Sequence, residues 1–254
     1  MDLGVEFELG QPIPGRILPP EQWTQTALKA YPPGGAIDWT DLFGRPGPVV
    51  LDIGCGNGRF TLQSAVERPD HFHLGVDTLP VVIRYARRRG NQRGLTNVRF
   101  AVGGGRELLL NHVAPQSVQE IHCYHPQPYY DQRLVFRRLI TPEFLALVYR
   151  SLTPGGLFVF QTDNPGYWRY AQKVIPLFFE FNEHLGPWED APEGRTRREI
   201  IALNQGLTVY RGIGRPRPGL SENDVRATAE SLPPPTFDAD RKLRAVDELE
   251  KQKD

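Results

Sequence analysis

The chain has 254 residues, enough for one large α/β domain with a substantial core, and its two cysteines are too few for a disulfide framework. We expect a reducing, cytoplasmic compartment, because the sequence shows neither a secretory signal nor an apolar stretch approaching the roughly 18 residues that span a membrane. The 30 basic and 30 acidic side chains cancel, yet residues 218–254 hold nine acids against six bases. A mildly basic body is therefore predicted to precede an acidic tail.

The composition divides the chain into three segments. Residues 1–46 are rich in proline and glycine without a sustained period, which predicts an irregular N-terminal arm rather than a separate domain. Residues 47–217 alternate strand and helix patterns and are predicted to form the folded domain. Residues 218–254 are polar and include three consecutive prolines, so we expect them to be disordered or weakly helical.

Secondary structure in the central segment follows a regular order. Apolar runs predict strands at residues 49–53, 73–77, 98–102, 118–124 and 157–161, with further possible strands at 178–182 and 207–211. Amphipathic runs predict helices at residues 59–67, 80–89, 106–111, 142–151 and 167–177. This alternation predicts βαβ units and an α/β fold with a doubly wound, mostly parallel sheet.

The turn after the first predicted strand carries glycines at alternate positions, in the sequence Asp52-Ile53-Gly54-Cys55-Gly56-Asn57-Gly58. Glycine allows a tight turn and a close approach of the backbone to a ligand. Asp77 ends the second predicted strand, where a carboxylate can accept hydrogen bonds from the ribose hydroxyls of an adenosine. Asp52 can reach the ammonium of an amino-acid moiety or orient the loop.

Two features favour S-adenosylmethionine over a nicotinamide cofactor. Position 59 is arginine, so the third glycine of the dinucleotide fingerprint is missing. A Leu-x-Pro-Gly-Gly turn at 152–156 precedes the fifth strand, as in class I methyltransferases. A nicotinamide-dependent oxidoreductase remains the alternative that the glycine turn and Asp77 leave open.

The loop after the fourth predicted strand, His125-Pro126-Gln127-Pro128-Tyr129-Tyr130, is expected to face the acceptor. Its prolines stiffen the backbone, and its tyrosines offer flat faces on which a base can stack. The arginines that follow, Arg133, Arg137 and Arg138, can engage phosphates. Two further arginine-rich segments, 84–99 and 195–217, are either phosphate-binding patches or solvated faces.

From about Val49 to Arg211 the sequence resembles the bacterial tRNA (guanine-N7)-methyltransferase family. The first three matching motifs are L-[DE]-I-G-x-G-x-G at 51–58, L-G-[VI]-[DE] at 74–77 and G-L-x-N-[VL]-R at 94–99. The family's P-D-P-W loop and R-x-x-x-R-R fall at 126–129 and 133–138, T-D-x-x-x-Y at 162–167 and T-x-x-E at 196–199. Their order and spacing carry the resemblance.

The resemblance implies a Rossmann-like class I methyltransferase that uses S-adenosylmethionine, has tRNA as its partner and no metal or membrane, and methylates N7 of the variable-loop guanine. It implies cofactor contacts at Asp52, Gly54, Gly56, Asp77, Gly104 and Gln127. It implies substrate contacts at Asp131, Arg133, Asp163, Thr196 and Glu199. Asp163 and Glu199 could accept from the guanine N1 and N2 donors, or pair with local arginines.

Four positions depart from the family pattern. Gln127 replaces the acid of the P-D-P-W loop, Tyr129 its tryptophan, Asp131 a lysine, and Gly104 the acid expected after the third strand. Guanine N7 has an unprotonated lone pair, so methyl transfer needs in-line positioning rather than a general base. We assign Gln127 the catalytic position and predict a weakened or retuned site. The alternatives are another acceptor, or an RNA-binding homologue with weakened catalysis.

Overall fold

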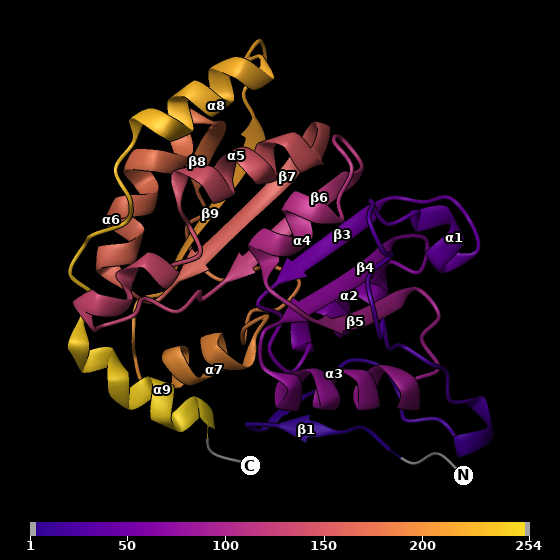
Figure 1. The fold of residues 1–254 in the computed structure, drawn as a ribbon. Coiled ribbons are helices and arrows are strands. Elements are labelled where there is room, and N and C mark those ends of the chain that lie inside the picture. Colours follow the sequence, from indigo (N-terminus) through magenta and orange to yellow (C-terminus); the bar gives the residue numbers. More distant parts are fainter. Residues whose placement is uncertain (1–3, 252–254) are drawn as a thin grey trace.

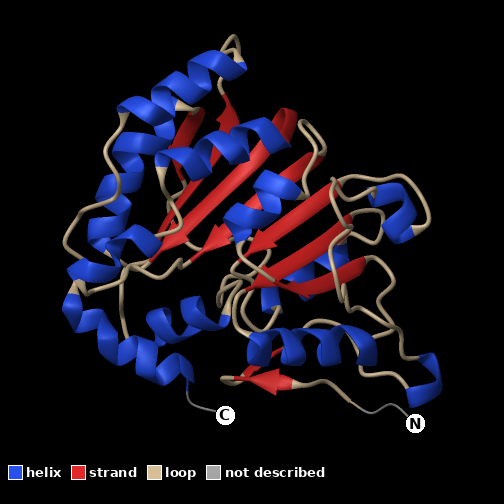
Figure 2. Ribbon diagram, viewed as in Figure 1, coloured by secondary structure: helices blue, strands red, loops and turns tan. Residues whose placement is uncertain are grey.

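A seven-stranded sheet with helices on both faces forms the centre of the molecule (Figures 1 and 2). The computed structural model describes residues 4–251. The strands lie in the order β5-β4-β3-β6-β7-β9-β8, and only β9 runs antiparallel to its neighbours. This arrangement confirms the predicted doubly wound, mostly parallel sheet. The strands are β3 (Val49–Ile53), β4 (Phe72–Asp77), β5 (Val98–Val102), β6 (Val118–Tyr124), β7 (Leu152–Thr162), β8 (Phe179–Glu183) and β9 (Tyr210–Pro216).

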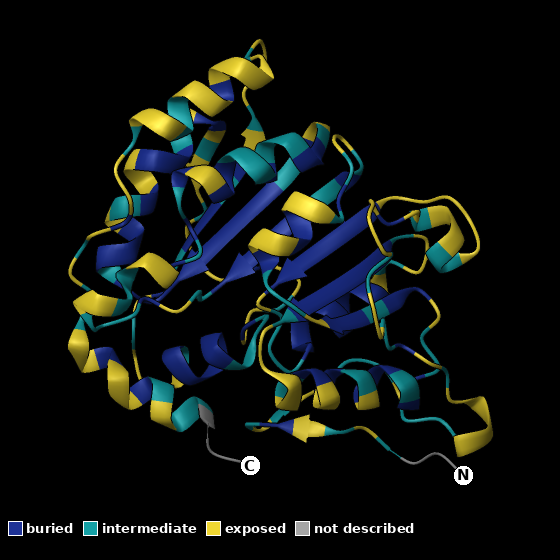
Figure 3. Cartoon of the chain, viewed as in Figure 1, coloured by how far each residue is buried: buried dark blue, intermediate teal, exposed yellow. Residues whose placement is uncertain are grey.

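Two apolar layers hold the helices against this sheet. Leu62, Ile83 and Phe100 belong to the layer under α2 (Arg59–Glu67) and α3 (Pro80–Gln92). A larger layer on the other face receives α4 (Gly105–Asn111), α5 (Pro142–Ser151) and α6 (Pro165–Val174). The central strands β3, β4 and β6 have no exposed residue, whereas β8 at the edge is mostly exposed (Figure 3). Burial on both faces explains why β3 reads Val-Val-Leu-Asp-Ile without alternation.

The predicted boundaries are close to the observed ones except near β7 and β9. The Leu-x-Pro-Gly-Gly segment was expected to be a turn, but β7 already begins at Leu152, and the register with β6 shifts between Val118 and Glu120. The last strand was expected at 207–211 and lies instead at Tyr210–Pro216. Gly212 and Gly214 interrupt the apolar pattern by which a strand is predicted. The structure needs glycine at both positions, because a Cβ there would meet the Phe179 and Phe181 side chains of β8.

The N-terminal arm packs against the folded domain at the β5 edge of the sheet. Its described part contains the strand pair β1 (Phe7–Glu8) and β2 (Gln11–Pro12), the short helix η1 (Pro20–Gln22) and α1 (Trp39–Phe43). The Phe100 amide donates to the Thr26 carbonyl at 2.7 Å, and the Leu28 amide donates to the Phe100 carbonyl at 3.0 Å. The arm therefore pairs locally with the exposed edge of β5.

The acidic tail, for which disorder or weak helix was expected, is largely helical up to residue 251. It forms α8 (Glu222–Ser231), η4 (Arg241–Leu243) and α9 (Arg244–Lys251). A capping box between Ser221 and Asp224 starts α8, which packs on α5, and α9 packs on α7 (Arg197–Asn204). Local composition could not predict these helices, because contacts with distant parts of the chain, α5 and α7, stabilise them. Residues 1–3 and 252–254 of the predicted arm and tail lie outside the described residues.

Within residues 4–251, no helix is long and apolar enough to cross a membrane.

Candidate active site

The glycine turn between β3 and α2 forms an open cradle at the carboxyl edge of the sheet. Gly54 and Gly56 have φ of +81° and +54°, and a Cβ at either position would meet nothing within 4 Å. Gly58 differs, because a Cβ there would lie 2.8 Å from the Ala86 side chain. The first two glycines thus leave space for a ligand, whereas Gly58 allows α2 and α3 to pack closely.

Two carboxylates flank this cradle. The Asp52 Oδ2 accepts from the Thr61 hydroxyl at 2.5 Å, while its buried Oδ1 has no hydrogen-bond partner. Burial raises the pKa of Asp52 to about 7. Asp77, at the end of β4, accepts from the Gly56 amide at 3.1 Å and the Leu79 amide at 2.9 Å. Burial also raises the pKa of Asp77, although these backbone donors oppose the shift.

The loop after β5 carries no polar side chain at the expected cofactor position. Gly104 begins α4 with β-region dihedrals, and a Cβ there would meet only the Glu107 carboxylate, at 3.5 Å. Tyr31 of the arm reaches the same loop, with its hydroxyl 2.8 Å from the position that a Gly103 Cβ would take. Sequence reasoning missed Tyr31, because only the pairing of the arm with β5 brings it to this edge.

The acceptor loop leaves β6 in a tightly fixed conformation. His125 and Tyr129 are non-glycine residues with φ of +47° and +46°, an uncommon backbone conformation. The His125 amide donates to the Gln161 carbonyl at 2.7 Å, and the two side chains hydrogen-bond at 2.8 Å. Gln127 is exposed at the tip between its two prolines. The loop thus presents Gln127 from a backbone held by β7.

Arg138 has a structural role, which corrects the expectation that it binds phosphate. Its guanidinium is buried and donates to the carbonyls of Pro128, Tyr129, Pro235 and Phe237 at 2.6–3.1 Å. It therefore fastens the acceptor loop to the tail.

Asp131 and Arg133 lie together at the start of the next turn. The Asp131 carboxylate accepts from Arg133 Nη2 at 2.6 Å, and the arginine side chain is 88% exposed. Hydrogen bonding from Arg133 lowers the pKa of Asp131 to about 2. The predicted substrate residues Asp131 and Arg133 thus form an ion pair, in which the carboxylate of Asp131 balances the charge of Arg133.

Asp163 lies just after β7, between the side chains of His125 and Arg198. Its Oδ2 accepts from Arg198 Nε at 2.8 Å, and its Oδ1 lies 3.5 Å from His125 Nδ1. Burial opposes ionisation, but His125 and Arg198 hold the pKa of Asp163 well below its usual range. The sequence placed Arg198 only in an arginine-rich segment and gave no signal that it would contact Asp163.

Thr196 and Glu199 form the first turn of α7. The Thr196 hydroxyl accepts from the Glu199 amide at 3.1 Å, which is an N-cap interaction. The Glu199 carboxylate is fully buried and accepts from Arg211 Nη2 at 2.5 Å and from the Arg195 amide at 2.8 Å. Glu199 has the arginine-paired role that the sequence left open, and its carboxylate is inaccessible to a base in this arrangement.

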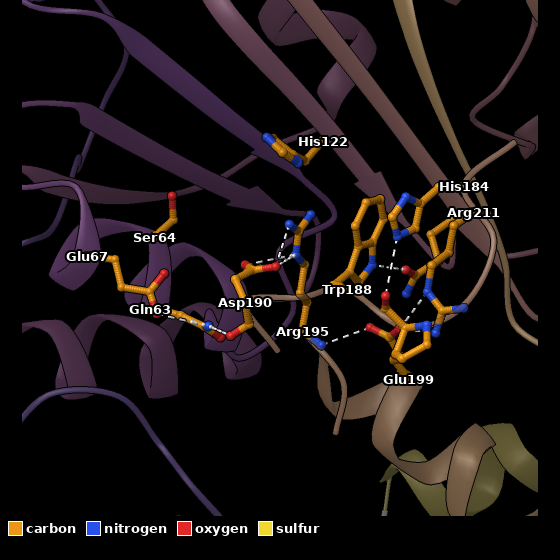
Figure 4. Close-up of polar contacts among 12 residues, drawn as sticks. Gln63, Ser64, Glu67, His122, His184, Trp188, Asp190, Arg195, Glu199 and Arg211 are labelled. Atoms are coloured by element: carbon orange, nitrogen blue, oxygen red, sulfur yellow. Dashed lines mark hydrogen bonds and ion pairs between the residues drawn. The ribbon is translucent and has the colours of Figure 1, made fainter. Parts of the chain in front are cut away.

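Arg195 joins this turn to a polar cluster on the sheet face (Figure 4). Its guanidinium donates to the Asp190 carboxylate and to the Tyr124 hydroxyl, and it lies 3.9 Å from the centre of the Trp188 ring. A cavity of about 310 Å³ opens beside these groups, under α2. Arg195 and Asp190 pair with each other in this cluster. The hydrogen bond from Arg195 to Tyr124 also holds the end of β6, from which the acceptor loop starts.

A protein-family model described as a putative methyltransferase matches residues 46–211. A tRNA (guanine-N(7)-)-methyltransferase of Halorhodospira halophila is 32% identical over 77% of this chain and 86% of its own length. The chain belongs to the tRNA (guanine-N7)-methyltransferase family. The enzyme of that name from Thermus thermophilus is 38% identical over 57% of this chain, which spans 45% of its length. The chain likewise spans 62% of a Streptomyces avermitilis relative of the same name.

Solved structures show the fold of this family member. The 16S rRNA methyltransferase KamB superposes with a TM-score of 0.54 at 18% identity, covering 72% of this chain and 95% of its own. A 16S rRNA (adenine(1408)-N(1))-methyltransferase variant from Catenulisporales acidiphilia gives 0.52 at 13% identity, covering 72% and 92% of the two chains. These likenesses confirm a class I methyltransferase fold.

The cofactor of this family is S-adenosylmethionine, and the residues present fit it. The space above Gly54 and Gly56 accepts a ligand against the backbone, and the unpartnered Oδ1 of Asp52 can receive an ammonium donor. Asp77 lies where ribose hydroxyls are bound in this kind of fold.

Proposed function

We propose that this protein transfers a methyl group from S-adenosylmethionine to N7 of a guanine in tRNA, at the variable-loop position numbered 46. The observation that carries this proposal is the juxtaposition of the glycine cradle with the stiff acceptor loop. β3 and β6 are neighbours in the sheet, so the turn after β3 and the loop after β6 lie at the same edge. A methyl group held by the first is thereby presented to a base held by the second. The proposed location is the cytoplasm, where tRNA is modified.

The cofactor supplies an electrophilic methyl group on a sulfonium. The residues proposed to bind it are Asp52, Gly54, Gly56, Asp77 and Gln127, with the loop at Gly104 closing the adenine end. Guanine N7 needs no deprotonation, so the chain has only to bring the lone pair in line with the methyl group. The proposed role of Gln127 is positioning, because its amide lies exposed at the loop tip. Its neutral oxygen is a weaker acceptor than a carboxylate.

On the acceptor side we propose Asp163 as the guanine acceptor and the pair Asp131 and Arg133 as a contact to the RNA backbone. Asp163 is held ionised by its neighbours and retains acceptor capacity on Oδ1, which makes it fit for the N1 and N2 donors. Thr196 and Glu199 act indirectly, by fixing the first turn of α7 beside Asp163.

A second candidate is a methyltransferase of the same lineage with another acceptor, or an RNA-binding homologue with weakened catalysis. The neutral Gln127 at the loop tip favours it.

The decisive experiment is transfer of labelled methyl from S-adenosylmethionine to unmodified tRNA, followed by mapping of the label. We expect label at N7 of the variable-loop guanine and none when that residue is 7-deazaguanine, which lacks the lone pair. Label elsewhere would favour another acceptor. Cofactor binding without any label would favour the RNA-binding homologue.

A further inference from the structure

The C-terminal helix α9 covers the side of the site where the acceptor is expected. In Figure 1, α9 runs beside α7. Leu243, Val246 and Leu249 form a small apolar cluster with Ile201 of α7 and Tyr130 of the acceptor loop. With this helix in place, the Asp163 and Arg198 side chains are only 6% and 7% exposed. Two side chains of α9, Asp247 and Glu250, hydrogen-bond Arg198 directly and so contribute to this burial.

Arg198 is shared between the site and this helix. Its Nε donates to Asp163, while its Nη1 donates to Asp247 at 2.6 Å and to Glu250 at 3.3 Å. Three carboxylates thus surround one guanidinium. Asp163 alone would balance the charge of the arginine, and α9 adds two further carboxylates within hydrogen-bond distance of it.

Before it reaches α9, the tail is hydrogen-bonded at residues 235–238 to the segment that follows the acceptor loop. Arg138 donates to the Pro235 and Phe237 carbonyls, and Gln132 donates to Asp238. Beyond this point a cavity of about 480 Å³ lies between residues 238–241 and the start of α6. The tail is therefore anchored at Arg138 before it reaches α9.

Carboxylates and phosphates bind a guanidinium with the same fork of N–H donors. We propose that Arg198 is a binding subsite for a phosphate of the RNA acceptor, and that Asp247 and Glu250 occupy it as internal substitutes until RNA replaces them. This inference rests on the proposed RNA substrate and goes beyond it, since it gives the tail an autoinhibitory role.

The test compares RNA binding by the full chain and by the isosteric double variant Asp247→Asn, Glu250→Gln. Unmodified tRNA is titrated in the presence of S-adenosylhomocysteine at several salt concentrations, with fluorescence anisotropy as the readout. The matched control is Glu222→Gln, Glu230→Gln, which removes two exposed tail charges on α8. Affinity for S-adenosylhomocysteine, measured by calorimetry, reports whether each variant is folded.

We expect the α9 variant to bind tRNA roughly fivefold or more tightly, and the dependence of log K on log salt to steepen by about 0.7–0.9. The control should change affinity less than about twofold. Adding Arg198→Gln should abolish the gain. Unchanged or weaker binding by the α9 variant, or a gain that persists without Arg198, would overturn the proposal. Methyl mapping on the wild-type chain tests the proposed function separately, because RNA affinity is read without turnover.

Discussion

The proposed site has a cofactor half, around the glycine cradle, and an acceptor half, around Asp163 and α7. The two halves differ in how many of their buried polar atoms already have hydrogen-bond partners within the chain. On the cofactor half, Asp52 has an unpartnered oxygen and the backbone at Gly54 and Gly56 faces open space. On the acceptor half, Asp163 and Glu199 are both buried against arginines. The cofactor half thus has an acceptor atom and space for a ligand, whereas the acceptor half is stabilised by ion pairs between its own carboxylates and arginines. Substitutions on the two halves should therefore have different kinds of effect.

The largest expected effect is on folding, from Glu199→Ala on the acceptor half. It leaves the guanidinium of Arg211, itself 4% exposed, without its partner. Breaking a buried pair costs about 3–5 kcal/mol, so we expect a loss of that order in the free energy of unfolding, measured with urea. Glu143→Ala, which breaks the exposed pair with Arg106, should cost less than about 1 kcal/mol. Full stability of Glu199→Ala with weaker tRNA binding would contradict the structural role.

Asp77→Ala should have the next largest effect, on the cofactor half. The change removes a carboxylate that accepts hydrogen bonds from the Gly56 and Leu79 amides and that we propose binds the ribose. A charged hydrogen bond contributes about 1.5–3 kcal/mol, so affinity for S-adenosylhomocysteine, measured by calorimetry, should fall roughly 10- to 150-fold. Asp70→Ala, in the loop before β4, is the matched control and should bind normally. Normal binding by Asp77→Ala would place the ribose elsewhere.

Asp52 makes the stability of the cofactor half depend on pH. Its pKa is raised by burial to about 7 in the folded chain, so the folded state holds a proton that the unfolded state releases near pH 4. This contribution is fully present below about pH 4 and is lost as pH rises towards 7, by on the order of 1 kcal/mol per pH unit. Thermal unfolding at pH 5 and 7 should show the decline in the wild type. Asp52→Asn should flatten it, and an equal decline in that variant would assign it to another group.

The smallest expected effect is a gain at the acceptor loop. Gln127→Asp with Asp131→Lys restores the two residue types that the family pattern predicts, and a charged acceptor forms a stronger hydrogen bond. We expect kcat/KM for tRNA methylation to rise roughly three- to tenfold. Gln116→Asp, an exposed change before β6, should leave it unchanged. A lower rate in the double variant would show that the loop is retuned for another acceptor rather than weakened.

The sheet, the glycine cradle and the position of Asp77 at a strand end could be predicted from the sequence, because they depend on local patterns. Apolar runs buried on both faces define β3 to β6, and a ligand turn at the first strand end follows from the order of the elements. The prediction was least accurate at β9 and in the tail. There the stabilising partners lie far along the chain, as when Arg138 contacts the carbonyls of Pro235 and Phe237.

The contacts of the arginines, by contrast, could not be predicted from the sequence. The sequence leaves Arg89, Arg138 and Arg211 open as phosphate ligands, but each is buried against carboxylates or carbonyls of the same chain. A guanidinium pairs with whatever anion the fold brings within reach, and sequence spacing does not reveal that partner. The same reason hid the contact between Arg198 and α9, whose two carboxylates meet the site through packing across about 50 residues of chain.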